Sequence, residues 1–411
     1  MVITGRWNNQ SISISLKPNA LTISLQRKGA PDSQVYSFDG LGRLWTAMRA
    51  GVSYRRGLNG RTVAKWLAGP PGMDALRERR WLEDREAAQL EDDARQMAAE
   101  FYQAIVTGQA ALSEPLPPEG RRFLEQIAAF DRDRYQEDVN AYHQVYQPVG
   151  ILPPDQYMAV VLQATEGCSF NTCTFCNFYR GRRFRIKSKA EFREHALAAR
   201  DFLGPGLSLR RTIFLGDANA LVVPMPRLVE LLEVTHEIFD VEALGGIYAF
   251  LDGFSGEKKS VDDYRRLREL GVRRIYVGLE SGNADLLRLL KKPGRPEDAI
   301  QAVQAIHAGG IAVGVIVLLG AGGRAYARAH VRDTITALNA MNLGIDDLVY
   351  FSELVESEGL EYTRDAYQQQ LGPLTPTQRL AQGAAIEKRL NFSAASGAPH
   401  ISRYDIREFV Y

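Results

Sequence analysis

The chain has 411 residues, of which 45% are hydrophobic and 24% charged, and its formal net charge is +1. This composition is typical of a globular protein with a sizeable core, and the near-neutral charge implies no electrostatic partner. No run approaches about 18 uninterrupted apolar residues, and the N-terminal MVITGRWNNQSISIS lacks a basic segment followed by an apolar one, so we expect neither membrane spanning nor secretion.

Short β-forming segments open the chain. Residues 11–16 (SISISL), 21–26 (LTISLQ) and 35–38 (VYSF) alternate or are rich in β-formers, and the turn signals KPNA and GAPD separate them. This pattern predicts a small antiparallel meander. The residues around Ala50 and Gly51 add either two strands or a helix, with strands favoured.

A charged helical pattern follows over about residues 73–109, and the proline-rich EPLPPEG interrupts it. A second helix is predicted over about residues 121–140. We therefore expect an antiparallel β accessory region over residues 1–70 and a helical accessory region over residues 71–150.

From Tyr157 onward, apolar strand-like runs alternate with helical stretches. The predicted strands are YMAVVLQAT, RTIFLG, GGIYAFL, RRIYVGLE, IAVGVIVLLG and DDLVYF. Such alternation argues for a parallel sheet with crossover helices. We expect an α/β core over residues 151–355 and a C-terminal extension over residues 356–411.

The only cysteines, Cys168, Cys173 and Cys176, lie within nine residues in a C-x4-C-x2-C motif. Three soft thiolates without a fourth indicate a cluster or metal with one open coordination position. A plant-type two-iron site needs a fourth cysteine and is excluded. A structural zinc site would need a distant ligand, because no histidine lies between His143 and His195. A four-iron cluster with one iron free of protein ligands is the best account.

The segment EGCSFNTCTFCNFYRGRRF resembles the cluster loop of the radical S-adenosylmethionine (SAM) superfamily, with one residue more than the usual C-x3-C-x2-C spacing. The resemblance implies that the three cysteines hold a [4Fe-4S] cluster, that SAM chelates its fourth iron, and that Phe175 lies against the adenine. It also implies an open parallel (β/α)6 partial TIM barrel. In such barrels ligands gather at the C-terminal ends of the strands, where the cysteine loop falls.

Two further strand ends resemble SAM-contacting segments of the superfamily. Gly216 and Asp217 end the second strand, where relatives use a Gly-Glu or similar pair to hold the SAM amino group. Glu280 and Ser281 end the fourth strand and resemble the segment that contacts the ribose. Taken singly, each segment also reads as a turn or a helix cap.

Three more positions complete the SAM site that the resemblance implies. Lys292 falls where relatives often carry a basic residue that pairs with the SAM carboxylate, although a solvated lysine near a helix end is the alternative. Ile316 and Leu318 of the fifth strand are expected to offer apolar side chains to the adenine. The order of all these segments along the chain favours the SAM site. His330, Thr334 and Asn339, on the next helix, are expected to serve packing and capping and not catalysis.

The resemblance implies that a low-potential electron cleaves SAM to methionine and a 5'-deoxyadenosyl radical, which abstracts hydrogen from a small-molecule substrate or biosynthetic intermediate. Reduced ferredoxin or flavodoxin is the implied electron donor. Free thiols and an oxygen-sensitive cluster suit the cytoplasm. The region before the barrel is predicted to close over the substrate, although a dimerisation or stabilising role is the alternative.

A second class of function stays open. A non-catalytic iron-sulfur or zinc module could bind RNA or a protein partner through Arg55, Arg56, Arg61 and the basic run at 77–80. Those basic residues are interleaved with acids, which is typical of a solvated helix face and does not favour nucleic acid.

Overall fold

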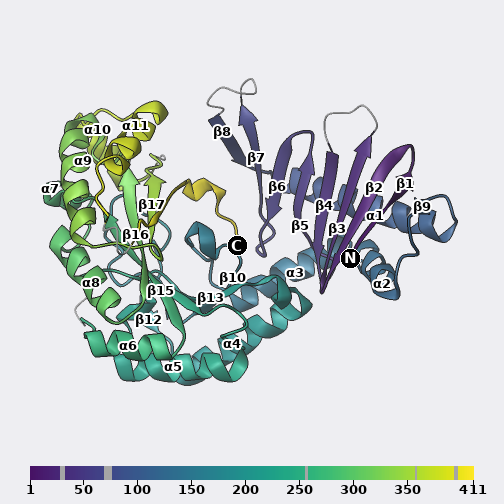
Figure 1. Ribbon diagram of the computed structural model, residues 1–411, viewed down its shortest axis with the longest axis horizontal. Helices are drawn as coiled ribbons and strands as arrows, with labels where there is room; N and C mark the ends of the chain where they lie inside the picture. Colours follow the sequence, from purple (N-terminus) through teal and green to yellow (C-terminus); the bar gives the residue numbers. More distant parts are fainter. Residues whose placement is uncertain (28–32, 69–75, 255–257, 357–358, 393–396) are drawn as a thin grey trace. The chain divides into compact units, whose positions relative to one another are not determined.

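The computed structural model describes the chain except residues 28–32, 69–75, 255–257, 357–358 and 393–396 (Figure 1). It divides into two compact units. The first comprises Met1–Pro148, Ala198–Arg210 and Arg407–Tyr411, and the second comprises Val149–Leu197 and Arg211–Ile406.

A nine-stranded antiparallel sheet dominates the first unit. Strands β1 to β8 follow one another as a meander, and β9 pairs with the free edge of β1. The strands are β1 (Val2–Trp7), β2 (Gln10–Lys17), β3 (Ala20–Arg27), β4 (Ser33–Asp39), β5 (Leu44–Arg49), β6 (Val52–Arg56), β7 (Thr62–Ala68), β8 (Leu76–Trp81) and β9 (Ala111–Leu112). The predicted meander is confirmed and is larger than expected.

Strands, and not a helix, flank Ala50 and Gly51. Both residues have positive φ, 48° and 73°, and they form the two-residue connection between β5 and β6. Such a connection matches the twist of the two strands it joins. The predicted turn GAPD, residues 29–32, lies outside the described residues.

One face of the sheet packs on two helices, α1 (Asp84–Val106) and α2 (Pro118–Ala128). Alternate residues of β2 and β3 are buried, as the period of a half-buried strand requires. Trp7 on β1 meets Phe101 on α1 with ring centroids 5.3 Å apart. The apolar residues that alternate along these strands therefore pack into a hydrophobic core.

The helix predicted from residue 73 begins later in the structure. Residues 76–81 form β8, which pairs with β7 over six residue pairs. The partner strand overrides the local helical preference there, as sheet context commonly does. Helix α1 starts behind Glu83, which forms a capping box with Glu86.

The single helix predicted over residues 121–140 is two helices, α2 and α3 (Arg132–Val145). Asp131 begins the second one, because its side chain accepts a 3.1 Å hydrogen bond from the Arg134 backbone N–H. An aspartate that caps a helix in this way marks a boundary that apolar periodicity alone does not reveal.

A seven-stranded sheet, parallel at every pairing, forms the second unit, in the order β10-β13-β14-β15-β16-β17-β18. The strands are β10 (Ala159–Gln163), β13 (Thr212–Gly216), β14 (Ile247–Leu251), β15 (Val272–Glu280), β16 (Ala312–Leu319), β17 (Leu348–Glu353) and β18 (His400–Tyr404). The helices are α4 (Lys189–Leu203), α5 (Met225–Ile238), α6 (Val261–Glu269), α7 (Ala284–Leu289), α8 (Pro296–Ala308), α9 (Gly323–Ala340), α10 (Glu361–Gln368) and α11 (Pro376–Glu387). Figure 1 shows the helices along the outer side of the sheet.

The strands lie in chain order across the sheet, which is the arrangement of a partial TIM barrel, and the expected fold class is confirmed. All six predicted strands are present. The seventh, β18, pairs with β17 from Leu348↔His400 to Ser352↔Tyr404. It was missed because HISRY has no apolar run and is only partly buried, so the sheet extends beyond residue 355.

In the part of the chain that the structure describes, no helix has the length and apolar character needed to cross a membrane.

Candidate functional site

The cysteine loop follows β10 and is closed at its base by a small ribbon. Strands β11 (Thr165–Glu166) and β12 (Arg185–Ile186) pair antiparallel. Arg185 reinforces this pair with two hydrogen bonds of 2.7 Å to the two carboxylate oxygens of Glu166. Bidentate contacts of this kind fix geometry as well as adding energy. Residues 167–184 therefore form one bounded loop.

The middle of the loop is tied to the core by backbone hydrogen bonds. The Thr174 N–H donates to the Leu290 carbonyl at 2.9 Å, and the Thr174 carbonyl accepts from the Tyr362 N–H at 3.0 Å. The Thr172 hydroxyl donates to the Lys291 carbonyl at 3.2 Å. These contacts place Cys173 against the turn that follows α7.

All three cysteines line one cavity of about 250 Å³. Six of the seven parallel strands, β13 to β18, contribute a lining residue at or near the C-terminal end, and the cysteine loop follows the seventh strand, β10. The other lining residues are Ile151, Phe175, Asn177, Phe178, Tyr179, Ala218, Phe250, Leu251, Asp252, Gly278, Glu280, Lys292, Ile316, Leu318, Ser352, Glu353, Leu354, Val355, Leu360, Tyr404 and Ile406. The cavity thus lies where ligands gather in barrels of this kind.

The thiols are chemically suited to a cluster and poorly suited to a role as free nucleophiles. Burial raises the pKa of Cys173 to about 12 and that of Cys176 to about 11. Such thiols ionise readily only when a metal's positive charge offsets the burial. The Asn171 N–H already donates to the Cys168 sulfur at 3.4 Å, as a contact to a ligand thiolate would.

Among the described residues, no three or more His, Cys, Asp or Glu side chains converge to hold a single metal ion. A cubane [4Fe-4S] cluster does not require the three thiolates to meet at one point, because each thiolate binds a different iron. The three-cysteine donor set therefore fits a [4Fe-4S] cluster with one iron left open.

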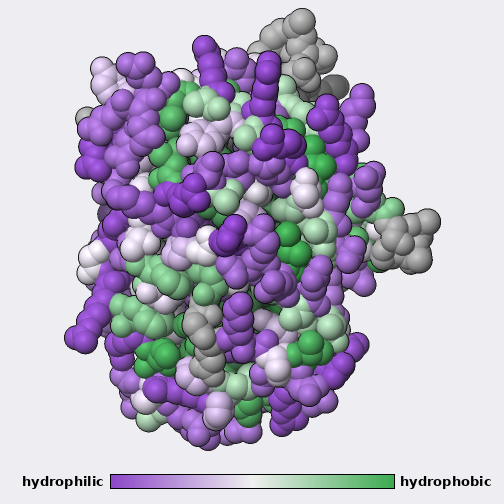
Figure 2. Space-filling model, turned by 90° about the vertical axis from the view of Figure 1, so that its left-hand side faces the viewer, coloured by the Kyte–Doolittle hydropathy of each residue, from purple (hydrophilic) through white to green (hydrophobic). Residues whose placement is uncertain are grey.

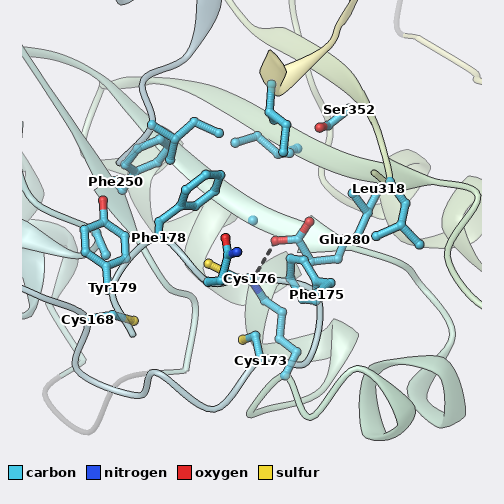
Figure 3. Close-up of a pocket in the computed structure, with 18 of the residues that line it drawn as sticks. Cys168, Cys173, Phe175, Cys176, Phe178, Tyr179, Phe250, Glu280, Leu318 and Ser352 are labelled. Carbon is cyan, nitrogen blue, oxygen red and sulfur yellow. Dashed lines mark hydrogen bonds and ion pairs between the residues drawn. The ribbon is translucent and has the colours of Figure 1, made fainter. Parts of the chain in front are cut away.

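Glu280 and Lys292 form an ion pair inside the cavity, with Lys292 Nζ 2.9 Å from Glu280 Oε1 and both side chains only about a tenth exposed. A dashed line marks the pair in Figure 3. Burial acts to lower the pKa of Lys292, but Glu280 and Cys173 together raise it above its ordinary value. The ammonium therefore stays charged beside the cysteines.

The backbone at the end of β15 is shaped to hold this pair. Glu280 has a φ of 57°, and the pairing with β16 shifts register between Gly278 and Glu280. A Cβ atom at Gly278 would lie 2.5 Å from Glu280 Oε1 and 2.8 Å from Lys292 Nζ. The glycine is thus what leaves room for the two charged groups.

Gly216 and Asp217 lie beside the loop but do not line the cavity; their neighbour Ala218 does. Asp217 is buried and accepts hydrogen bonds from Gln163 Nε2 at 2.8 Å and from the Gly167 N–H at 3.1 Å. Burial raises its pKa to about 6 against the effect of these bonds. The structure shows Asp217 anchoring the start of the cysteine loop.

Ser281 also points away from the cavity. It is fully buried, and its hydroxyl lies 2.7 Å from His330 Nδ1 on α9, while the Gly282 N–H donates to the Thr334 hydroxyl at 3.0 Å. Both His330 and Thr334 therefore contact the turn after β15.

The structure therefore brings five predicted SAM-contacting residues together with the cysteines: Phe175, Glu280, Lys292, Ile316 and Leu318. Figure 3 shows Phe175, Glu280 and Leu318 on one side of the cavity and Phe178, Tyr179 and Phe250 on the other. The sequence reasoning missed this second, aromatic side. Phe178 and Tyr179 follow the last cysteine directly, and Phe250 stands near a strand end, so their positions were a usable signal.

Comparison with known protein families agrees with the cofactors that the site residues predict. Residues 162–335 match the profile of the Radical SAM superfamily. Together with the cysteine loop at the strand ends, this match identifies residues 162–335 as a radical SAM domain. Its cofactors are accordingly a [4Fe-4S] cluster and SAM, as the cysteine loop predicted.

Similar solved structures are remote in sequence. Coproporphyrinogen III oxidase (HemN) from Escherichia coli has a TM-score of 0.40 at 15% identity, over 57% of this chain and 53% of that one. The hydrogenase maturase HydG from Carboxydothermus hydrogenoformans has a TM-score of 0.40 at 15% identity, over 78% and 73%. SuiB from Streptococcus suis has 0.39 at 11%, over 87% and 72%. The chain spans about half the length of the first of these, and no match to a curated protein sequence is found.

Proposed function

We propose that this enzyme binds SAM in the cavity beside the cysteine loop and uses it to abstract hydrogen from a small-molecule substrate. When bound, the cluster and SAM supply the 5'-deoxyadenosyl radical that removes the hydrogen atom. The observation that carries the proposal is that three cysteines and five predicted SAM contacts line one cavity at the ends of the parallel strands.

The protein's own part is to bind and orient. Cys168, Cys173 and Cys176 hold the cluster, and Lys292 offers a buried positive charge to the SAM carboxylate. Glu280 accepts hydrogen bonds from the ribose hydroxyls. Phe175 packs with Leu318 in one apolar cluster, which gives the adenine a flat apolar surface.

In this proposal SAM does not contact three of the predicted residues, Gly216, Asp217 and Ser281, which instead hold neighbouring segments in place. Asp217 keeps the loop entrance in place through Gly167, and Ser281 fixes the turn that carries Glu280. They stay positioning residues, since their side chains are engaged within the protein.

The aromatic side of the cavity is the proposed substrate surface. Phe178 and Phe250 lie on this side, and the acidic residues among the described residues that line the whole cavity are Asp252, Glu280 and Glu353. Lys292 is the single basic residue among the described residues that line the cavity. We infer that the substrate is small and largely apolar and carries no net negative charge, because an anion would meet acids and an already paired cation.

Electrons are proposed to come from reduced ferredoxin or flavodoxin. The outer edge of the cysteine loop supports this, because Thr172 and Arg180 are exposed and Arg180 donates a 3.2 Å hydrogen bond to the Cys173 carbonyl. A carrier docked there would stand next to a cluster ligand.

Anaerobic reconstitution with iron and sulfide, followed by dithionite and SAM, tests the proposal. The wild-type chain is expected to form 5'-deoxyadenosine and methionine, and Cys176→Ala to form neither. Zinc uptake without iron, or an iron-loaded chain that leaves SAM intact under these conditions, would refute it and favour the non-catalytic alternative.

A further inference from the structure

A second concave surface lies on the outside of the second unit, where α9 and α11 face each other. It is a groove of about 540 Å³ that shares no lining residue with the cavity described above. Its lining residues are Arg324, Ala327, Arg328, Val331, Arg332, Leu374, Gln378, Ala381, Gln382 and Arg389. Figure 2 shows the helical side of the molecule as largely hydrophilic, so a charged groove is in keeping with its surroundings.

The arginines of the groove form an ordered stripe. Arg324, Arg328 and Arg332 are four residues apart on α9, so they share one face, with neighbouring Cβ atoms about 6 Å apart. Arg389 joins them from the chain just beyond α11. All four side chains belong to exposed residues. The stripe therefore presents guanidinium groups along about 12 Å of helix.

Little negative charge balances this stripe. Among the described residues that line the groove there is no aspartate or glutamate. Arg332 pairs with its neighbour Asp333 at 2.6 Å, but Arg324, Arg328 and Arg389 make no ion pair within the residues that the structure describes. Three mutually repelling cations held close together favour an anion between them.

An independent observation comes from the floor of the groove. Gln382 is 5% exposed, and its Oε1 accepts a 2.8 Å hydrogen bond from the Gly320 N–H. That bond fixes which end of the amide is which, so Nε2 must face away from Gly320. Nε2 is buried and has no hydrogen-bond partner among the described residues. A buried donor left without an acceptor destabilises the structure, and a bound ligand oxygen would remove that cost.

We propose that this groove binds an anion that carries two or more phosphate groups. Arginine forks match phosphate oxygens bidentately, and a row of them suits several phosphates better than one. Gln382, which also lines the groove, would supply a further donor through Nε2. The described lining residues include no aromatic side chain that could stack on a base, so a nucleotide would be held by its phosphates.

Titration calorimetry with inorganic pyrophosphate on the full chain tests the proposal. Arg328→Gln combined with Arg389→Gln is expected to weaken binding about a hundredfold or more, because two charge-assisted contacts to the anion are lost. Gln382→Glu keeps the acceptor for Gly320 but puts an oxygen in place of Nε2, and it should weaken binding similarly. Arg288→Gln, an exposed arginine on α7, is the matched control and should bind as the wild type does.

Titrations of the wild type with ATP, monophosphate and RNA, compared with pyrophosphate, separate the sources of the phosphates. Equal affinity for pyrophosphate and ATP supports recognition through phosphates alone, and weaker binding of monophosphate supports the multi-phosphate class. Binding of a single-stranded RNA oligonucleotide without binding of pyrophosphate would overturn the proposal in favour of a nucleic-acid surface. Absence of pyrophosphate binding at millimolar concentration, or equal binding by the arginine double variant of matched thermal stability, would overturn it outright.

Discussion

Gly278→Ala isolates the ion pair in the cavity without removing either of its charges. The added methyl would lie 2.5 Å from Glu280 Oε1 and 2.8 Å from Lys292 Nζ, about 1 Å inside ordinary van der Waals contact. Both atoms end flexible side chains, and the backbone at Gly278 is not in the left-handed region. We therefore expect the fold to survive while the two charged groups move.

The displacement sets the size of the effect on SAM. A hydrogen bond to a charged group contributes about 1.5–3 kcal/mol, so misplacing one such contact should weaken SAM binding about 10- to 150-fold. Equilibrium dialysis of the anaerobically reconstituted variant measures this directly. Iron content and thermal midpoint serve as internal controls and should stay near those of the wild type.

A twofold or smaller change in SAM affinity, with normal iron content, would refute this reasoning. It would mean that the Glu280–Lys292 pair stands apart from the SAM site. SAM affinity of Lys292→Met is a second test. Removal of the ammonium should weaken SAM binding at least as much as its displacement does.

Three further predictions follow from the same geometry. Alanine at Cys176 should abolish iron uptake on reconstitution, measured by iron analysis, while the fold measured by circular dichroism persists. Phe175→Ala should weaken SAM binding by about 1–3 kcal/mol, the scale of a lost aromatic stack on a base, without loss of iron. His330, whose pKa burial lowers to about 4, is neutral in the folded chain and protonates when unfolded, so its stabilising contribution is present above pH 6.5 and is lost as the pH falls toward 4. Urea denaturation at pH 7 and pH 5 should show about 2 kcal/mol of this loss in the wild type and a shallower decline in His330→Asn; equal declines would contradict it.

The central architecture could be predicted because parallel strands buried on both faces read as continuous apolar runs. β10, AVVLQ, is buried at every residue. β18 could not be found in the same way, since HISRY is half-exposed and becomes a strand only by pairing with β17. β8 was misread for a related reason, because its charged sequence favours a helix until the edge of β7 is available.

For the candidate site, the positions of residues at strand ends could be predicted from the sequence, but the directions of their side chains could not. Positions at strand ends could be placed from chain order, which brought Phe175, Glu280 and Lys292 into one cavity with the cysteines. Side-chain direction could not, because a one-residue difference turns a side chain from the cavity into the core. Ser281 therefore contacts His330, and Asp217 contacts the loop base, although both stand next to residues that line the cavity.

Electron paramagnetic resonance of the dithionite-reduced, reconstituted protein, with and without SAM, tests the central claim most directly. The account predicts about four irons per chain and the signal of a reduced [4Fe-4S] cluster whose g-values shift when SAM is added. A cluster signal that SAM leaves unchanged at saturating concentration would contradict it, because the open iron is what the three-cysteine loop provides.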